Sequence, residues 1–181
     1  MFENAISKKE IAKIKKSSSK FSEAKTLKED GLTKEDVDLS FRDSSVSFSN
    51  DAWIYTLLFP FIEEANENSG WKYEIDSCEP VQIAKYGKDQ HYSWHQDGAS
   101  DHNAVDEKVR KLSLIATISN GYEGGELEFK QIENDGINVM KPSMRLGSVI
   151  IVPSYQCHRS TPVTKGTKQS LAMWCLGPPF R

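Results

Sequence analysis

The sequence predicts a mostly β domain with flanking helices, of the sandwich or jelly-roll type. After residue 71 many short runs alternate apolar and polar residues, and turn signals rich in glycine, asparagine and proline separate them. Before residue 70, two segments instead have apolar residues at helical spacing. Numerous short strands at this spacing are typical of packed antiparallel sheets. We expect one domain, residues 1–181, with a helical and polar part at about 1–70 and a jelly-roll core at about 71–177.

The amino-terminal third contains the two predicted helices. Residues 5–16 alternate lysines with isoleucines, which indicates an amphipathic helix. The polar segment 49–51 is typical of a helix cap, and apolar residues recur at helical spacing over 53–65. Gly70 is the expected stop. Because proline lacks the backbone N–H, Pro60 is expected to kink or divide this second helix.

From residue 71 onward the apolar period is that of a strand. On the segment 81–86, Val81 and Ile83 would face one side, and Gln82, Ala84 and Tyr86 would face the other. Apolar side chains on one face and polar ones on the other indicate a strand with one buried face. The predicted strands are residues 25–27, 46–48, 71–75, 81–86, 112–118, 126–130, 137–140, 148–152 and 169–176.

Composition argues against several classes of function. The formal net charge of −3 gives no overall attraction for nucleic acid or for an anionic membrane, and the amino-terminal lysines indicate a solvated face. No apolar run is long enough to span a bilayer or to form a signal peptide. The three cysteines, Cys78, Cys157 and Cys175, are predicted to be free thiols. We therefore expect a cytoplasmic protein with neither a nucleic-acid nor a membrane partner.

Three residues predict a metal site. His95 and Asp97 lie two positions apart where Tyr92 and Trp94 favour a strand, so their side chains would share a face. His158 begins or ends a later strand, which a jelly roll could bring beside the first. Two histidines and one carboxylate are the ligands of non-haem Fe(II) oxygenases, and they leave coordination positions open for chemistry. This pattern predicts an enzyme.

Lys168 is the second residue that points to chemistry. It begins an alternating run in which Lys168, Ser170, Ala172 and Trp174 would share one face. If that face lines the barrel interior, the buried ammonium requires an anion. A dicarboxylic keto acid meets this requirement, because one end could chelate the metal while the other end pairs with the lysine.

Other interpretations of these residues explain less. His91 and His95 have helical spacing, but a tyrosine stands where zinc proteases place their catalytic glutamate. Cys157 directly precedes His158, and consecutive strand residues point to opposite faces, so they are poorly placed as a catalytic dyad. A passive jelly-roll binding module has no need of the metal triad. An isomerase with the same triad would leave Lys168 without a role.

At these residues the chain resembles the Fe(II)- and 2-oxoglutarate-dependent dioxygenase superfamily, specifically its prolyl 4-hydroxylase-like branch. The resemblance covers about residues 40–177 and includes an H-x-D strand, an R-x-x-(S/T) strand, a glycine-glycine-glutamate turn and an H-x(3)-P-V-x-x-G-x-(K/R) segment. The chain departs from the family pattern at two positions. Gly87 directly follows Tyr86, earlier than in the Y-x-x-G spacing that precedes the H-x-D strand, and Val46 replaces the glycine of an R-x-S-S-G loop. The segments that carry the resemblance are 42–46, 86–97, 110–118, 124–129 and 158–168.

The resemblance implies a double-stranded β-helix, a jelly-roll variant, that uses Fe(II), 2-oxoglutarate and O2, with ascorbate as a candidate additional cofactor. It implies a hydroxylase of prolyl residues in a peptide or protein that releases succinate and CO2. The alternatives are the same chemistry on another residue or a small molecule, or a catalytically silent binding module. Segments 31–48 and 98–109 are expected to form rims that select the substrate. The implied roles are Fe(II) binding by His95, Asp97 and His158, co-substrate binding by Lys168, Tyr86, Thr117 and Trp174, and substrate contact by Arg42, Arg110 and Trp94.

Overall fold

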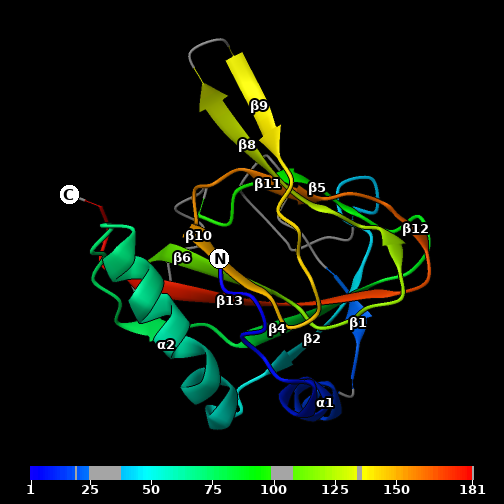
Figure 1. Ribbon diagram of the computed structural model, residues 1–181, viewed down its shortest axis with the longest axis horizontal. Helices are drawn as coiled ribbons and strands as arrows, with labels where there is room; N and C mark the ends of the chain where they lie inside the picture. The colour runs from blue at the N-terminus through cyan, green and yellow to red at the C-terminus, as the bar shows by residue number, and fades with distance from the viewer. Residues whose placement is uncertain (19, 25–37, 99–107, 134–135, 181) are drawn as a thin grey trace.

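The computed structural model describes all residues except 19, 25–37, 99–107, 134–135 and 181. Two antiparallel sheets and a two-stranded ribbon form the body, and two helices flank it (Figure 1). The prediction of a mostly β chain with flanking helices is therefore confirmed. The predicted strand at 25–27 and large parts of the two predicted rim segments lie outside the described residues.

The larger sheet has seven antiparallel strands and supplies most of the core. Its longest strand, β13 (Lys168–Gly177), lies between β4 (Val81–Tyr86) and β6 (Val109–Thr117), so side chains of these three strands share each face of the sheet. The strands across this sheet are β1 (Ser22–Glu23), β2 (Ser45–Ser49), β4 (Val81–Tyr86), β13 (Lys168–Gly177), β6 (Val109–Thr117) and β10 (Val149–Pro153), with β3 (Ser77–Cys78) paired to β13.

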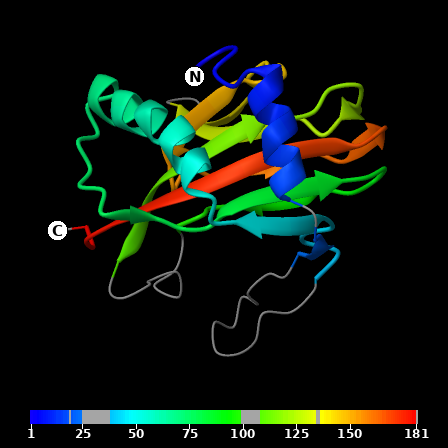
Figure 2. The ribbon, with the colours of Figure 1, turned by 90° about the horizontal axis from the view of Figure 1, so that it is seen from below.

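Helices α1 (Lys8–Ser17) and α2 (Ala52–Asn68) lie on the same face of the larger sheet (Figure 2). A capping box begins α1, because the Ser7 side chain accepts from the Glu10 N–H while the Glu10 carboxylate accepts from the Ser7 N–H. Helix α2 continues through Pro60, so the proline does not divide it. Within the described residues, no helix is both long and apolar enough to cross a membrane.

The main hydrophobic core lies between these helices and the sheet. It contains isoleucine and leucine side chains of both helices together with the apolar face of β4, β6 and β13. The face of the larger sheet that the helices do not cover can therefore line a site. The fully buried members include Ile14, Ile54, Leu58, Ile62, Val81, Ile83, Leu112, Leu114, Leu171 and Met173.

The smaller sheet covers the other side of the site. Its hairpin of β8 (Leu127–Glu133) and β9 (Gly136–Met140) extends away from the body of the molecule (Figure 1). A short ribbon, β7 (Glu123–Gly124) with β12 (Val163–Lys165), closes one end. The strands of the smaller sheet, in order, are β5 (Tyr92–His95), β11 (His158–Ser160), β8 (Leu127–Glu133) and β9 (Gly136–Met140).

The prediction of a strand at 71–75 is wrong, because this segment is irregular. The next strand is the two-residue β3 at Ser77–Cys78. The side chain of Asn66 occupies both backbone groups of Tyr73. Its amide nitrogen donates to the Tyr73 carbonyl at 2.8 Å, and its oxygen accepts from the Tyr73 N–H at 3.0 Å. A backbone whose donor and acceptor are already satisfied has none left there for a strand partner. The alternating aromatic residues pack against the core from an extended loop instead.

Candidate metal centre and co-substrate pocket

A small cavity of about 60 Å³ lies between the two sheets. Strands β4, β6 and β13 line it from the larger sheet, and β5, β8 and β11 line it from the smaller one. The two faces predicted from sequence alternation both point into this cavity, which confirms those assignments. The lining residues from these faces are Gln82, Ala84 and Tyr86 on β4, and Lys168, Ser170, Ala172 and Trp174 on β13.

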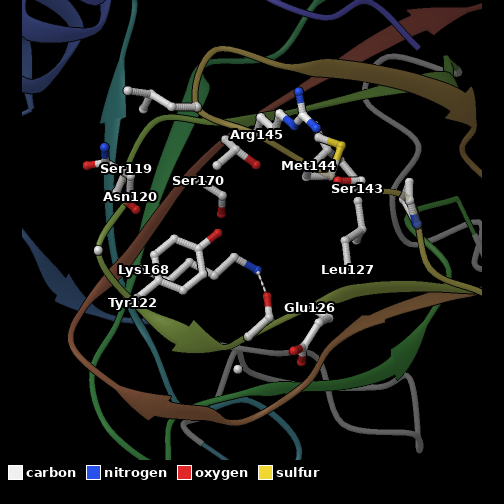
Figure 3. A pocket seen from close by; sticks show the side chains of 17 residues that line it. Ser119, Asn120, Tyr122, Glu126, Leu127, Ser143, Met144, Arg145, Lys168 and Ser170 are labelled. Atoms are coloured by element: carbon white, nitrogen blue, oxygen red, sulfur yellow. Dashed lines mark hydrogen bonds between the residues drawn. The ribbon is translucent and has the colours of Figure 1, made fainter.

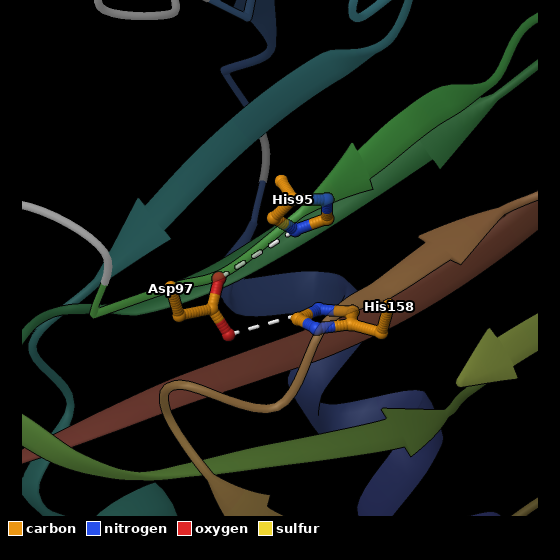
Figure 4. Close-up of side chains that lie close together, drawn as sticks. All are labelled: His95, Asp97 and His158. Atoms are coloured by element: carbon orange, nitrogen blue, oxygen red, sulfur yellow. Dashed lines mark ion pairs between the residues drawn. The ribbon is translucent and has the colours of Figure 1, made fainter. Parts of the chain in front are cut away.

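His95, Asp97 and His158 meet on the wall of this cavity (Figure 4). Each offers one ligand atom, and these atoms all lie within 4.8 Å of one another. The His95 Nε2 is 3.6 Å from one Asp97 carboxylate oxygen, and the His158 Nε2 is 3.7 Å from the other. His91 is not part of this group. The arrangement fits a single metal ion held by two imidazoles and one carboxylate.

The predicted shared strand for His95 and Asp97 is only half right. His95 is the last residue of β5, and Asp97 lies in the turn that follows it. The turn is fixed because the Gly98 N–H donates to the Ser154 carbonyl at 2.9 Å. His158 opens β11 and is paired in register with His95, which brings the two distant segments together as expected.

Backbone carbonyls orient both imidazoles. The His95 Nδ1 lies 2.8 Å from the Ser93 carbonyl, and the His158 Nδ1 lies 2.9 Å from the Gln156 carbonyl. A carbonyl oxygen can only accept, so each Nδ1 carries the hydrogen and each Nε2 keeps its lone pair for a metal. Tyr92 stacks on the His95 ring with 3.6 Å between ring centroids, which further fixes that ring.

The charges of the triad also suit a metal ion. Burial raises the pKa of the Asp97 carboxyl, but the interactions with His95 and His158 outweigh it and hold that pKa well below its usual range. Burial lowers the pKa of His158 although Asp97 opposes the effect. The ionised carboxylate and the neutral imidazole are the forms that bind metals.

A residue that the sequence interpretation missed, Glu79, supports the Asp97 turn through Arg110. The Arg110 guanidinium makes a bidentate pair with Glu79, with both donor–acceptor distances at 2.6 Å. Its remaining nitrogen, Nη1, donates to the backbone carbonyl of Asp97 at 3.2 Å. No local sequence pattern marks Glu79, because its partner Arg110 is 31 positions away in the chain.

Lys168 lies across the cavity from the metal ligands and is only 6% exposed. Its ammonium donates to the Gly125 carbonyl at 2.8 Å (Figure 3) and to the Ser160 hydroxyl at 2.7 Å. Within the described part of the chain it has no ion pair with a carboxylate, and burial lowers the pKa of Lys168 to about 8, although Glu126 opposes this. A buried ammonium with a free donor direction is suited to an anionic ligand.

The family is decided by the comparison of the sequence with known proteins. The model of the 2OG-Fe(II) oxygenase superfamily matches residues 81–176, a segment that contains all three candidate metal ligands and Lys168. The chain belongs to this superfamily. A PKHD-type hydroxylase of Alteromonas mediterranea is 32% identical over 99 residues, which are 52% of this chain and 42% of that protein. A PKHD-type hydroxylase of Klebsiella pneumoniae is 32% identical over 94 residues, 50% of this chain and 40% of its own length. The chain thus aligns with about two fifths of each relative.

Solved structures share the oxygenase fold. A viral collagen prolyl hydroxylase from Paramecium bursaria Chlorella virus-1, in complex with 2OG, matches with a TM-score of 0.67 at 17% identity, over 97% of this chain and 94% of that one. A Trichoplax adhaerens prolyl hydroxylase in complex with a hypoxia inducible factor peptide fragment also has a TM-score of 0.67, at 16% identity over 91% of this chain and 74% of that one. The predicted jelly-roll fold of the oxygenase is confirmed by this likeness.

The other residues with an implied co-substrate role each line one of the two cavities that Lys168 also lines. Tyr86 ends β4 and is paired in register with Lys168, whose ammonium is 5.3 Å from the centre of the tyrosine ring. Thr117 lines a second, larger cavity of about 540 Å³, which shares Lys168 and Ser170 with the small one (Figure 3). Trp174 lines the small cavity, and its buried Nε1 has no hydrogen-bond partner in the described region. The lysine thus stands where the two cavities meet.

The three residues with an implied substrate role are in different environments. Arg42 lines the small cavity, its guanidinium is 4.4 Å from the centre of the Tyr92 ring, and its buried Nη2 has no described hydrogen-bond partner. Arg110 lies over the Trp174 ring at 4.2 Å while it holds Glu79. Trp94 does not line the cavity. Its ring instead lies beneath two cations, Lys130 at 4.7 Å and Arg159 at 4.6 Å.

Proposed function

We propose that this chain is an Fe(II)- and 2-oxoglutarate-dependent dioxygenase that hydroxylates prolyl residues of a peptide or protein. In this proposal His95, Asp97 and His158 hold the metal, and Lys168 binds the far carboxylate of 2-oxoglutarate. The observation that carries it is the presence of both groups on the wall of one cavity: three ligand atoms within 4.8 Å and a buried ammonium without a carboxylate partner in the described residues. Family membership supports the same assignment.

The co-substrate site follows from the donors around Lys168. Two of the three ammonium hydrogens have partners, in Gly125 and Ser160, so one remains for an incoming carboxylate. The Tyr86 hydroxyl and Thr117 are proposed as further contacts to that carboxylate. Trp174 supplies an unsatisfied indole N–H on the same wall. Pairing with a carboxylate would offset the cost of burying the ammonium.

The chain's own residues prepare the site for oxidation. When bound, Fe(II) would supply the chemistry by which 2-oxoglutarate and O2 are converted to succinate and CO2 while the substrate is hydroxylated. The two backbone carbonyls leave both Nε2 atoms free to bind the ion, and the ionised Asp97 carboxylate would neutralise part of its charge. Tyr92 covers one face of the His95 ring and keeps water from that side.

A prolyl substrate is supported by the solved structures that share this fold. Two of the solved structures with the same fold are named as prolyl hydroxylases, and one of them holds a peptide fragment. The unsatisfied Nη2 of Arg42 at the cavity is suited to a carbonyl oxygen of a bound peptide. Arg110 and Trp94, neither of which lines the small cavity, are proposed as contacts to the part of the substrate outside it. We also propose a single domain acting in the cytoplasm, which rests on the composition of the chain.

The direct test measures succinate formation by the metal-stripped protein supplied with Fe(II), 2-oxoglutarate and O2, with and without ascorbate. A proline-rich peptide and a matched peptide with alanine in place of proline are compared. Iron-dependent succinate that rises only with the proline peptide, together with a mass gain of one oxygen on that peptide, is the expected result.

Two other outcomes would overturn parts of the proposal. Succinate without stimulation by proline, alongside oxidation of another residue or a small molecule, would reject the prolyl substrate and keep the dioxygenase. Iron binding without any succinate would reject the dioxygenase and favour a silent binding module.

A further inference from the structure

Two cysteines that the metal site does not use face each other across strands β3 and β13. Cys78 is directly opposite Cys175 in the register of these antiparallel strands. Their Sγ atoms lie 2.8 Å apart, although the residues are 97 positions apart in the chain. Cys175 is fully buried, whereas Cys78 is only partly buried.

The backbone at this pair suits a covalent bond between the two sulfurs. The Glu79 N–H donates to the Trp174 carbonyl at 2.9 Å. The backbone hydrogen bond is therefore made by the residues adjacent to the cysteines, and Cys78 and Cys175 are a non-hydrogen-bonded pair of the antiparallel ladder. In such pairs the side chains of the two strands approach each other most closely. The Cα separation typical of these pairs, about 4.5 Å, lies within the range of protein disulfides.

We propose that Cys78 and Cys175 are a site of reversible oxidation to a cross-strand disulfide. The oxidant is a small disulfide of the glutathione class. The Cys78 thiolate attacks one sulfur of the oxidant, forms a mixed disulfide and releases one thiol. The Cys175 thiolate then attacks the Cys78 sulfur and releases the second thiol. The two protein thiols lose two protons and two electrons, and the oxidant is reduced to two thiols.

The environments of the two sulfurs give them different parts in this exchange. The hydrogen bond from the Cys175 thiol lowers the pKa of Cys78 even though burial opposes it. The same contact, together with burial, raises the pKa of Cys175. The more accessible sulfur is therefore also the one that ionises first, as an attacking thiolate must. The buried sulfur can only react with its neighbour.

The disulfide would form next to residues that hold the Asp97 turn and line the small cavity. Glu79 follows Cys78 directly and holds Arg110, which donates to the Asp97 carbonyl. Trp174 precedes Cys175 and lines the small cavity. Strand β3 has only two residues, so a covalent bond at Cys78 would add a fixed link to its short pairing with β13. Oxidation is expected to slow hydrogen exchange at the Glu79 amide.

The test uses the full chain without added iron, equilibrated at a series of oxidised to reduced glutathione ratios. Acid quenching, alkylation of free thiols and peptide mass spectrometry then report the state of each cysteine. The expected result is the joint loss of alkylation at Cys78 and Cys175, the appearance of one linked peptide pair lighter by two hydrogens, and full reversal by dithiothreitol. Cys157, which is also partly buried, serves as the internal comparison.

Variants separate the disulfide from general thiol reactivity. Cys157→Ser should leave the linked peptides unchanged, whereas Cys175→Ser should leave Cys78 able to form only a glutathione adduct. Circular dichroism establishes that each variant is folded. Adducts on Cys78 of the unmodified chain without a linked peptide, or no change at any ratio, would overturn the proposal. Because no iron, 2-oxoglutarate or substrate is present, the result is independent of the proposed function.

Discussion

The Arg110 guanidinium joins Glu79 to the backbone carbonyl of Asp97, with a donor–acceptor distance of 3.2 Å to that carbonyl. Asp97, a proposed metal ligand, lies in a turn, and this contact ties the backbone of that turn to Glu79. The same guanidinium lies over Trp174 at the cavity. Arg110 therefore connects the metal ligand with the pocket wall, and we infer a positioning role for it.

Removal of the Arg110 side chain should weaken metal binding more than it affects the fold. Arg110→Met is expected to lower Fe(II) affinity by about 10–100-fold, the usual effect of losing a contact that orients a metal ligand. Metal titration by fluorescence or calorimetry would measure it. Lys108→Met, which removes a partly exposed ion pair to Asp76, is the matched control. Equal affinities for both variants and the unmodified chain would exclude the positioning role.

The carboxylate ligand itself should be indispensable. Asp97→Ala is expected to abolish iron-dependent succinate formation, because one of the three proposed ligands is lost. The fold should persist, since the substitution removes a buried carboxylate that lies against two imidazoles. Asp51→Ala, at a helix start where the side chain makes no cap hydrogen bond, controls for loss of an aspartate. Turnover by the Asp97 variant would contradict the ligand set.

Lys168→Met should act mainly on the co-substrate. The loss of one partner of a buried ion pair typically costs about 3–5 kcal/mol. A difference of that size corresponds to an increase of at least about 100-fold in the KM for 2-oxoglutarate. Lys165→Met, which removes an exposed ammonium paired with Glu123, should leave the KM unchanged. An unchanged KM in the Lys168 variant would move the anchor to another cation, with Arg145 at the larger cavity as the next to test.

The pKa of Lys168 predicts a pH dependence with a defined sign. Burial lowers this pKa to about 8 in the free protein, so the ammonium loses its charge as pH rises above that value. Affinity for 2-oxoglutarate should therefore fall between pH 7 and 9, by at most about tenfold per pH unit. The buried ammonium also costs stability below pH 8, and that cost should disappear as pH rises toward 10.5, the ordinary pKa of a lysine. Lys168→Met should lack both effects, and a parallel pH profile in that variant would reject the assignment.

Gly124 should tolerate no side chain. Its φ is +73°, and a Cβ there would stand 2.5 Å from the Pro162 carbonyl oxygen. Gly121 has a similar φ of +76° but open space around it, so Gly121→Ala should cost only the left-handed backbone strain of about 1–2 kcal/mol. Gly124→Ala should cost about 1–3 kcal/mol more. Thermal unfolding of both variants measures the difference, and equal melting temperatures would show that the loop moves aside freely.

Local periodicity in the sequence was enough to identify the elements and the face that each one presents. The alternation of β13 assigned Lys168 and Trp174 to the same side, and both do line the cavity. The helical spacing after residue 52 identified α2, and the segments 112–118 and 148–152 are strands within a few residues. These assignments succeed because a strand or a helix fixes the relative directions of its own side chains.

Contacts between elements could not be predicted in this way. The prediction for 71–75 is wrong because Asn66 satisfies the backbone of Tyr73, and a side chain that reaches another segment leaves no periodic trace. Asp97 lies in a turn whose position depends on Arg110 and Glu79.

The sequence by itself determined which residue types can bind a metal and a keto acid, and the strands on which most of them lie. Only the tertiary structure decided how the Asp97 turn is held and that Cys78 meets Cys175, 97 positions along the chain. The physical reason is that cross-strand register and contacts between side chain and backbone arise when distant segments pack. Local periodicity, in contrast, is set within each segment alone.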